Sequence, residues 1–370
     1  MVTEGPGLLL TLFAFAVVIG SLVFVHEYGH YWAGRLFGVK ADAFSIGFGK
    51  ELTGWTDKRG TRWKIAMLPL GGYVQFAGDM GAASQPDPEF ERLPEAERSQ
   101  MFQSKPLWQR AIIVAAGPVT NFAVAIAIFA GFFIAFGQPV TPSVVPEVPA
   151  NTAAAEIGLQ PGDEILAING NRTETFGAMA REVSIHPAEP VTIAVERAGR
   201  ELQLQGTLGV RIEQDRFGNQ YKLGLLGIPW PQQVMRDVPL WEAPIAATKQ
   251  TGDVVRLMVT TLGQVFTGRR SVKELGGPLK IAQVSGEQLS LGLYAFIGFI
   301  ALISINLGFI NLLPIPMLDG GHLLMYAVEA VRRKPVGPQA MEWAYRTGFA
   351  VVIAFMLLVT FNDLSSFGLF

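Results

Sequence analysis

Four long apolar stretches constrain this chain more than any other feature. Each is long enough to cross a hydrocarbon core of about 30 Å as a helix. They run roughly from Gly7 to Val25, from Ala111 to Gly137, from Leu291 to Leu313 and from Tyr345 to Phe361. Only 16% of the 370 residues are charged, against roughly 25% in soluble domains. The sequence predicts a polytopic α-helical membrane protein with about four transmembrane helices and room for one soluble domain.

The distribution of Lys and Arg predicts the orientation in the membrane. Eleven basic residues lie between Arg35 and Arg110, and residues 1–7 and 363–370 contain none. Because basic residues favour the cytoplasmic side, we expect both termini and segment 138–290 to face away from the cytoplasm. The net charge of −2 also predicts that no nucleic acid is a partner.

The first apolar stretch ends in His26-Glu27-Tyr28-Gly29-His30, an H-E-x-x-H pattern. Helical residues four apart share a face, so both imidazoles can reach one metal ion, with Glu27 as general base. Polar side chains within a membrane are energetically costly and usually functional. The alternative is that the two histidines are ordinary hydrogen-bonded residues of a helix. The pattern occurs once in the sequence, at a membrane boundary, and this disfavours the alternative. This pattern predicts an intramembrane metalloprotease.

A third metal ligand is expected, since zinc hydrolases usually use three protein ligands and the chain has no cysteine. The strongest candidate is Asp319, which follows Pro314 and Pro316. These prolines must interrupt the third helix, and irregular backbone at membrane depth persists only in protein or beside a wet cavity. We expect Gly320 and Gly321 to permit a tight turn and close backbone approach.

Three other side chains could offer a ligand to this site. Glu329 and His322 are rivals of Asp319 for the third position. His322 is expected rather to be a hydrogen-bonding partner of the site or a helix-capping residue. His186 is expected to be an ordinary surface histidine of the soluble domain.

A β-hairpin is predicted between the first two helices. The segments Ala43–Gly49 and Trp63–Val74 are apolar and flank a turn at residues 57–60. Such a hairpin fits the membrane boundary. An unpaired edge at Phe44–Gly49 or Lys64–Tyr73 could bind a substrate segment as an added strand.

Segment 144–228 is predicted to be a soluble α+β domain. The run Gly158–Gly170 contains a turn, a strand and an Asn-Gly hairpin turn, and it resembles a PDZ domain in permuted order. That resemblance implies that an extended peptide or a C-terminus adds to the strand near Tyr221–Ile228, at Leu223, Gly224 and Leu225. The alternative is a spacer that excludes bulky proteins sterically. Residues Ala243–Phe266 predict an amphipathic helix.

Together these motifs resemble the site-2 protease family, and within it the branch of bacterial regulator-of-sigma-E proteases. The resemblance rests on HEYGH, the N-x-x-P-x-P-x-x-D-G-G-H run, one PDZ-like domain and four spans. Further matching segments are Pro69–Val74, the Gly117-Pro118-x-x-Asn121 motif and Phe361-Asn362-Asp363.

The family resemblance implies Zn²⁺ held by His26, His30 and Asp319, with Glu27 as catalytic base. It implies that the hairpin is membrane-reentrant and holds substrate, and that Asn311 clamps the substrate backbone. The complete set of implied substrate-binding residues is Asn311, Pro314, Pro316, Gly71, Gly72 and Tyr73.

The resemblance also implies a bacterial inner-membrane enzyme whose zinc site lies near the cytosolic side. Its implied substrates are single-pass membrane proteins already trimmed outside, such as anti-sigma factors, and remnant signal peptides. Many members of this branch carry two PDZ domains, whereas this chain shows one, so the manner of substrate selection does not transfer.

The sequence therefore predicts eight consecutive regions. They are helix 1 with HExxH (1–37), a cytosolic-side loop with the reentrant hairpin (38–110), helix 2 (111–137), a PDZ-like periplasmic domain (138–230), an amphipathic helical linker (231–290), helix 3 with NxxPxPxxDG (291–318), a cytosolic-side loop (319–344), and helix 4 with the C-terminal tail (345–370). Two other classes are a non-catalytic PDZ scaffold, which should bind no zinc, and a transporter, which needs ionisable groups along a path.

Overall fold

The computed structural model describes residues 6–78, 94–173, 175–214, 220–267, 271–272 and 276–366. They form two compact units, one made of Met1–Ala130 with Pro244–Phe370 and the other of Gly131–Ala243. The second unit is wider than the predicted segment 138–230, because β3 (Gln138–Val140) pairs with β10 (Val234–Arg236). This pairing corrects the prediction that residues 231–290 are a helical linker throughout.

Within the residues that the structure describes, four helices are long and apolar enough to cross a membrane, as the sequence predicted. They are α1 (Leu8–Leu36), α3 (Leu107–Phe136), α8 (Leu293–Asn311) and α10 (Pro338–Ser366). The protein is therefore a membrane protein. The other described helices of the first unit are α2 (Glu95–Arg98), the 3-10 helix η2 (Phe102–Ser104), α6 (Ala243–Phe266), α7 (Pro278–Ser290) and α9 (Asp319–Arg332).

Segment 319–344, predicted to be a loop, is mostly helical. Helix α9 occupies its first half and α10 begins at Pro338. From the sequence, Gly320 and Gly321 are expected to permit a tight turn. In the structure they belong to the first turn of α9, where they allow it to pack against preceding backbone.

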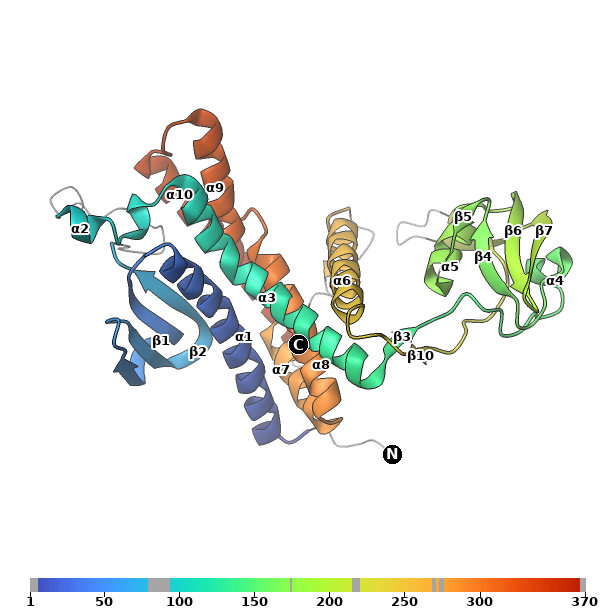
Figure 1. Cartoon of the computed structure of the whole chain (residues 1–370), viewed down its shortest axis with the longest axis horizontal. Helices are drawn as coiled ribbons and strands as arrows, with labels where there is room; N and C mark the ends of the chain where they lie inside the picture. The colour runs from blue at the N-terminus through green and yellow to red at the C-terminus, as the bar shows by residue number, and fades with distance from the viewer. Residues whose placement is uncertain are drawn as a thin grey trace. The chain divides into compact units, whose positions relative to one another are not determined.

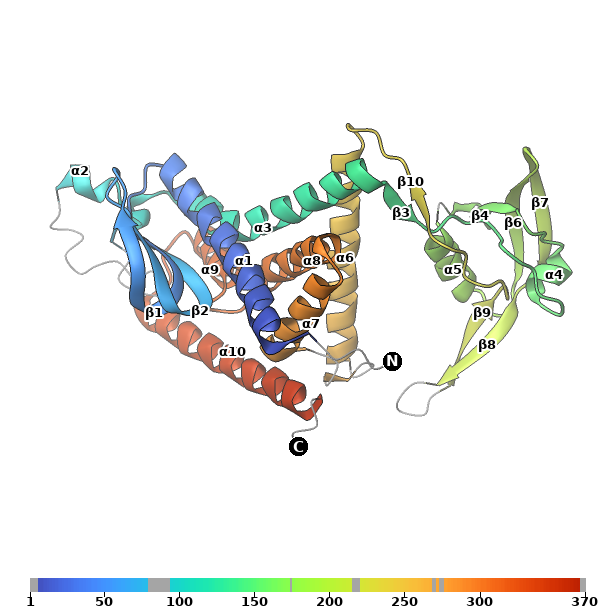
Figure 2. The same ribbon diagram turned by 90° about the horizontal axis from the view of Figure 1, so that it is seen from below.

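Helix α1 is the centre of the first unit. It packs against α7 and α8, with the hairpin along its other side (Figures 1 and 2). Ala14, Val18 and Leu22 on one face of α1 are buried with Phe296 of α8. Near the end of α10, the buried Asp363 carboxylate accepts the backbone N–H groups of Gly277, Leu279 and Lys280. It thus satisfies the free donors at the start of α7.

The hairpin consists of β1 (Ala41–Thr56) and β2 (Arg62–Phe76). Its turn forms where predicted, because Asp57 Oδ1 accepts the backbone N–H groups of Arg59 and Thr61. Residues 43–46 lie opposite both 72–75 and 62–65. The predicted free edge at Phe44–Gly49 is therefore wrong at residues 44–46. The predicted edge at Lys64–Tyr73 is wrong at Lys64 and Ile65, which are paired on both sides, and holds at Gly72 and Tyr73, which are paired on one side. The strands curl, so that residues 51–56 and 72–76 form the two outer segments.

The second unit is an α+β domain. Its four-stranded sheet has the order β5-β4-β6-β7, beside a separate β8-β9 pair. The bounds are β4 (Glu164–Ile168), β5 (Asn171–Arg172), β6 (Pro190–Arg197), β7 (Arg200–Thr207), β8 (Gly209–Gln214), β9 (Gln220–Leu225), α4 (Ala153–Ile157) and α5 (Phe176–Ser184). Sheet residues such as Ile165 and Ile193 share a core with Met179 of α5. Asn169 and Gly170 both have positive φ and form the predicted hairpin turn.

Candidate metal centre

Three side chains converge although they are far apart in the sequence. His26 and His30 come from successive turns of α1, and Asp319 is the first residue of α9. The Nε2 atom of His26 lies 3.2 Å from Asp319 Oδ2 and 3.2 Å from His30 Nε2. His30 Nε2 lies 3.5 Å from Asp319 Oδ1. All three residues offer a ligand atom within 4.8 Å of the others.

This donor set fits zinc. Two imidazole nitrogens and one carboxylate are three protein ligands of the kind that catalytic zinc sites use, with a further position left for water. Asp319 Oδ2 is buried without a hydrogen-bond partner, which is destabilising unless a cation or proton lies there. Among the described residues, His26, His30 and Asp319 are the group of at least three histidines and acids whose ligand atoms lie close enough to bind one metal ion.

The connection between α8 and α9 places Asp319. Helix α8 ends at Asn311, before the two prolines, as predicted. A Cβ on Gly320 would overlap the carbonyls of Leu312 and Leu313, and one on Gly321 that of Ile315. The start of α9 therefore packs directly on the preceding backbone, which confirms the expected close approach.

Helix α3 supports both histidines from behind. The carbonyl of Ile113 lies 2.9 Å from His30 Nδ1, and Asn121 Nδ2 lies 3.1 Å from His26 Nδ1. A Cβ on Gly117 would overlap the His30 ring, so glycine is required there. These roles were not assigned from the sequence. The available signal was Asn121, a polar residue within an apolar helix.

The outer segment of β2 lies beside Glu27. The backbone of Val74 is within hydrogen-bonding reach of the Glu27 carboxylate. A Cβ on Gly72 would lie 3.1 Å from Glu27 Cγ and 2.6 Å from Val23 Cγ1. Gly71 has a φ of +118°, which glycine alone adopts readily. The Tyr73 ring stacks 6.0 Å from that of Phe48. Gly71–Tyr73 thus lie next to the proposed general base.

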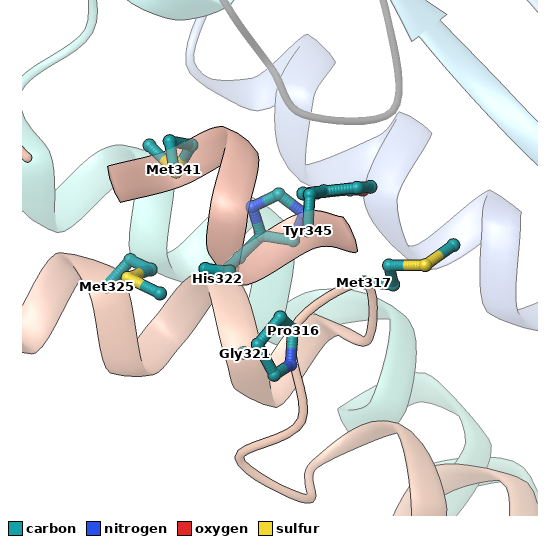
Figure 3. Close-up of a pocket in the computed structure, with 8 residues that line it drawn as sticks. Pro316, Met317, Gly321, His322, Met325, Met341 and Tyr345 are labelled. Carbon is teal, nitrogen blue, oxygen red and sulfur yellow. The ribbon is translucent and has the colours of Figure 1, made fainter. Parts of the chain in front are cut away.

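The rival ligands have other partners. Glu329 pairs with Arg110 at 3.1 Å. His322 does not cap α9, because Leu318 is the N-cap residue. Its ring lies in a small pocket between α9 and α10, 6.1 Å from the ring of Tyr345 (Figure 3). Of the other predicted residues, Pro316 lines this pocket, while Asn311 and Pro314 lie at the end of α8 and just after it.

The residues predicted to bind peptide lie in the second unit. Leu223, Gly224 and Leu225 belong to β9, which lies against the end of α5. A Cβ on Gly224 would overlap the carbonyl of Val183. In the same unit His186 Nδ1 bonds Glu189 at 2.7 Å. The Glu189 side chain raises the pKa of this histidine above its ordinary value.

An H-E-x-x-H helix joined to a distant carboxylate, within long apolar helices, defines a membrane-embedded zinc metallopeptidase. Comparison with known families agrees with this class. Peptidase family M50 matches residues 14–355, and the chain belongs to that family. It is therefore a zinc metalloendopeptidase of the site-2 protease type.

The similarity to its relatives extends over nearly the whole chain. A protein of Agrobacterium fabrum, whose name proposes a zinc metalloprotease, is 44% identical over 95% of both chains. Metalloprotease MmpA of Caulobacter vibrioides is 38% identical over 98% of both chains. Among solved structures, the PDZ domain of an SdrC-like protein from Listeria monocytogenes matches 24% of this chain and 85% of that domain, with 21% identity and a TM-score of 0.18.

Proposed function

We propose that this enzyme cleaves a peptide bond within the transmembrane segment of a single-pass membrane protein. In this proposal His26, His30 and Asp319 hold the zinc ion and Glu27 is the catalytic base. The observation that carries this proposal is that ligand atoms of His26, His30 and Asp319 lie within 4.8 Å of one another. Glu27 directly follows His26 on the same helix.

The chain's own residues divide the chemistry between them. When bound, zinc supplies Lewis-acid chemistry, polarising the water and the substrate carbonyl. Glu27 accepts the proton of the attacking water and delivers it to the nitrogen of the leaving amine. The backbone of Val74 lies close enough to the Glu27 carboxylate to help orient it. Glu27 is half-buried and directly follows His26 on the same helix.

Substrate is held as an added strand. A transmembrane helix must be unwound before cleavage, because its carbonyls are hydrogen-bonded within the helix. Residues 72–76 are an outer segment of the curled hairpin and lie next to Glu27. This outer segment offers backbone hydrogen bonds that replace those of the helix. The end of α8 and the segment after it also contact the substrate backbone, through Asn311, Pro314 and Pro316.

The remaining proposals concern location and substrate class. The enzyme lies in a bacterial inner membrane, with its termini and PDZ-like unit in the periplasm and the zinc site towards the cytosol. The basic residues between α1 and α3 support this orientation. Its substrates are proteins already trimmed outside, of the anti-sigma factor type, or remnant signal peptides. The PDZ-like unit either binds an extended peptide at Leu223–Leu225 or filters substrates by size.

Proteoliposomes test this function. Purified enzyme is mixed with a single-pass substrate that carries either a short or a bulky periplasmic domain. Cleavage within the span of the short form, absent with Glu27→Gln, is the expected result. Undiminished cleavage by Glu27→Gln would refute the catalytic role of Glu27. Equal cleavage of both substrates would refute the size filter but not the proposed proteolysis.

A further inference from the structure

Asn121 makes a contact at the metal centre that the proposed reaction does not use. It lies in α3, is fully buried, and places its side-chain amide 3.1 Å from His26 Nδ1. The other amide atom, Oδ1, is buried without a hydrogen-bond partner. A buried polar group in this state is destabilising, so its presence in an apolar helix calls for a compensating role.

The two histidines present the same nitrogen to the centre. In both, Nε2 faces Asp319, and Nδ1 points away towards α3. His30 Nδ1 meets the carbonyl of Ile113, which can only accept a hydrogen bond. His30 must therefore carry its proton on Nδ1, which leaves the lone pair of Nε2 free for a metal ion.

His26 needs an equivalent partner, and Asn121 is the group in place. An amide can present either its NH₂ group or its oxygen, and half a turn about the Cβ–Cγ bond exchanges them within the same volume. With NH₂ towards Nδ1, the proton of a neutral His26 would lie on Nε2, where it would block the metal. With oxygen towards Nδ1, Nε2 is free and Oδ1 accepts the Nδ1–H, while NH₂ takes the position that Oδ1 holds now.

We propose that Asn121 is a positioning residue that accepts the Nδ1–H of His26 and so directs the His26 lone pair to zinc. This inference rests on the proposed ligand set. Metal-binding histidines generally donate their second ring N–H to an oxygen acceptor, and loss of that acceptor weakens metal binding by roughly 10- to 100-fold. Asn121 and Ile113 thus fix both ligands from one helix.

Helix α8 fixes the backbone that carries this amide. Ser304 Oγ donates to the carbonyl of Asn121 at 2.8 Å. A Cβ on Gly308 would lie 3.1 Å from the Pro118 carbonyl and 3.2 Å from the Phe122 ring. The packing of α3 on α8 is therefore independent of the side-chain amide. Ser304→Ala disturbs this packing and leaves the acceptor intact, so it is the matched control.

Zinc affinity tests the proposal directly, measured by competition with a chelator on the purified full chain in detergent. Wild type and His26→Ala are compared first, because zinc binding lost in His26→Ala establishes the ligand set whatever Asn121 does. Asn121→Leu keeps the side-chain shape and removes the acceptor, and we expect about 10- to 100-fold weaker binding. Asn121→Asp can only accept when ionised, and we expect binding within about threefold of wild type, or tighter.

The Asp variant tests the acceptor role. Asn121→Asp keeps an acceptor at this position, so a tenfold or greater loss of zinc affinity in a folded Asn121→Asp protein overturns the proposal. Wild-type affinity in Asn121→Leu, or an equal loss in Ser304→Ala, overturns it too. Should Asn121→Leu fail to fold, retention or loss of zinc by Asn121→Asp decides the question.

Discussion

Two carboxylates, one buried in the second unit and one half-buried in the first, show how structure and function use the same chemical group differently. Asp163 in the second unit is 1% exposed and receives two hydrogen bonds of 2.7 Å from Arg197 and one of 2.8 Å from the backbone of Gln160. Asp319 in the first unit faces two histidines and keeps an oxygen without a hydrogen bond.

A carboxylate whose oxygens have their hydrogen-bond partners within the protein, like Asp163, fits a structural role. A carboxylate that keeps an oxygen without a partner, like Asp319, fits the proposed role of a metal ligand. Burial acts to raise the pKa of Asp163, but the hydrogen bonds from Arg197 and Gln160 outweigh it and hold that pKa below its ordinary value. The carboxylate is thus stabilised by the folded protein itself. The Asp319 carboxylate gains a partner for this oxygen only when a cation or a proton lies there.

Substitution of Asp319 by Asn should have the largest effect. We expect bound zinc to fall from about one per chain to near zero, with proteolysis lost, because one of three ligands is replaced by a weaker donor. The thermal stability of the zinc-free protein should not fall, since a buried charge without a full set of partners is removed. Zinc content by mass spectrometry and melting of the zinc-free protein check this. A lower melting temperature would mean that Asp319 is structural, like Asp163.

Glu27→Gln should separate catalysis from metal binding. We expect cleavage to fall by about 10²- to 10⁴-fold, the usual contribution of a general base. Zinc content should remain that of the wild type, because Glu27 is not a proposed ligand. Cleavage rates and zinc content of the same preparation provide the measurement. Loss of zinc in this variant would place Glu27 among the ligands instead.

Gly117→Ala tests whether α3 must leave room for the His30 ring. A Cβ there would overlap this ring, whereas one on Gly131 of the same helix has nothing within 4 Å. We expect Gly117→Ala to weaken zinc binding by about 10-fold or more, as loss of support behind a ligand does. Gly131→Ala is the matched control and should bind zinc as wild type does. Equal zinc affinities for both variants would contradict the geometry of this contact.

Asp163→Ala should affect only the second unit. We expect its unfolding free energy to fall by roughly 2–4 kcal/mol, because a buried ion pair loses one partner while Arg197 can still reach water. Zinc content should stay unchanged. Hydrogen exchange of β4 and β6 in the full-length protein measures the loss, with the exposed Glu201→Gln as control. Unchanged exchange in Asp163→Ala would remove the structural half of the comparison.

The pH dependence of the same unit is the smallest effect. The pKa of Asp163 is lower in the folded protein than its ordinary value of 3.8. Its stabilisation is therefore complete above about pH 4 and is lost as pH falls through the folded pKa. The stability difference between wild type and Asp163→Asn should shrink below pH 4, measured by hydrogen exchange corrected for intrinsic rates. A difference that grows in acid would have the wrong sign.

The sequence predicted that His26, His30 and Asp319 come together, because local patterns encode their placement. The four-residue spacing of His26 and His30 fixes their shared helix face, and the prolines before Asp319 mark the end of α8. The hairpin turn at Asp57 was also predictable, since its carboxylate bonds nearby backbone.

What the sequence did not predict depends on contacts between distant elements. The curling of the hairpin, which places residues 43–46 between two segments, follows from packing and not from alternation. The contact of Asn121 with His26 joins α3 to α1, and no local pattern carries it. The same holds for β10, whose pairing with β3 extends the second unit.

Zinc-edge X-ray absorption of the purified wild-type protein tests the joint ligand sphere most directly, because imidazole gives a distinctive outer-shell signal. The arrangement of α1 and α9 predicts one zinc per chain, bound by two imidazoles with oxygen completing the coordination. A zinc with fewer than two imidazoles, or a folded protein that binds none, would contradict it.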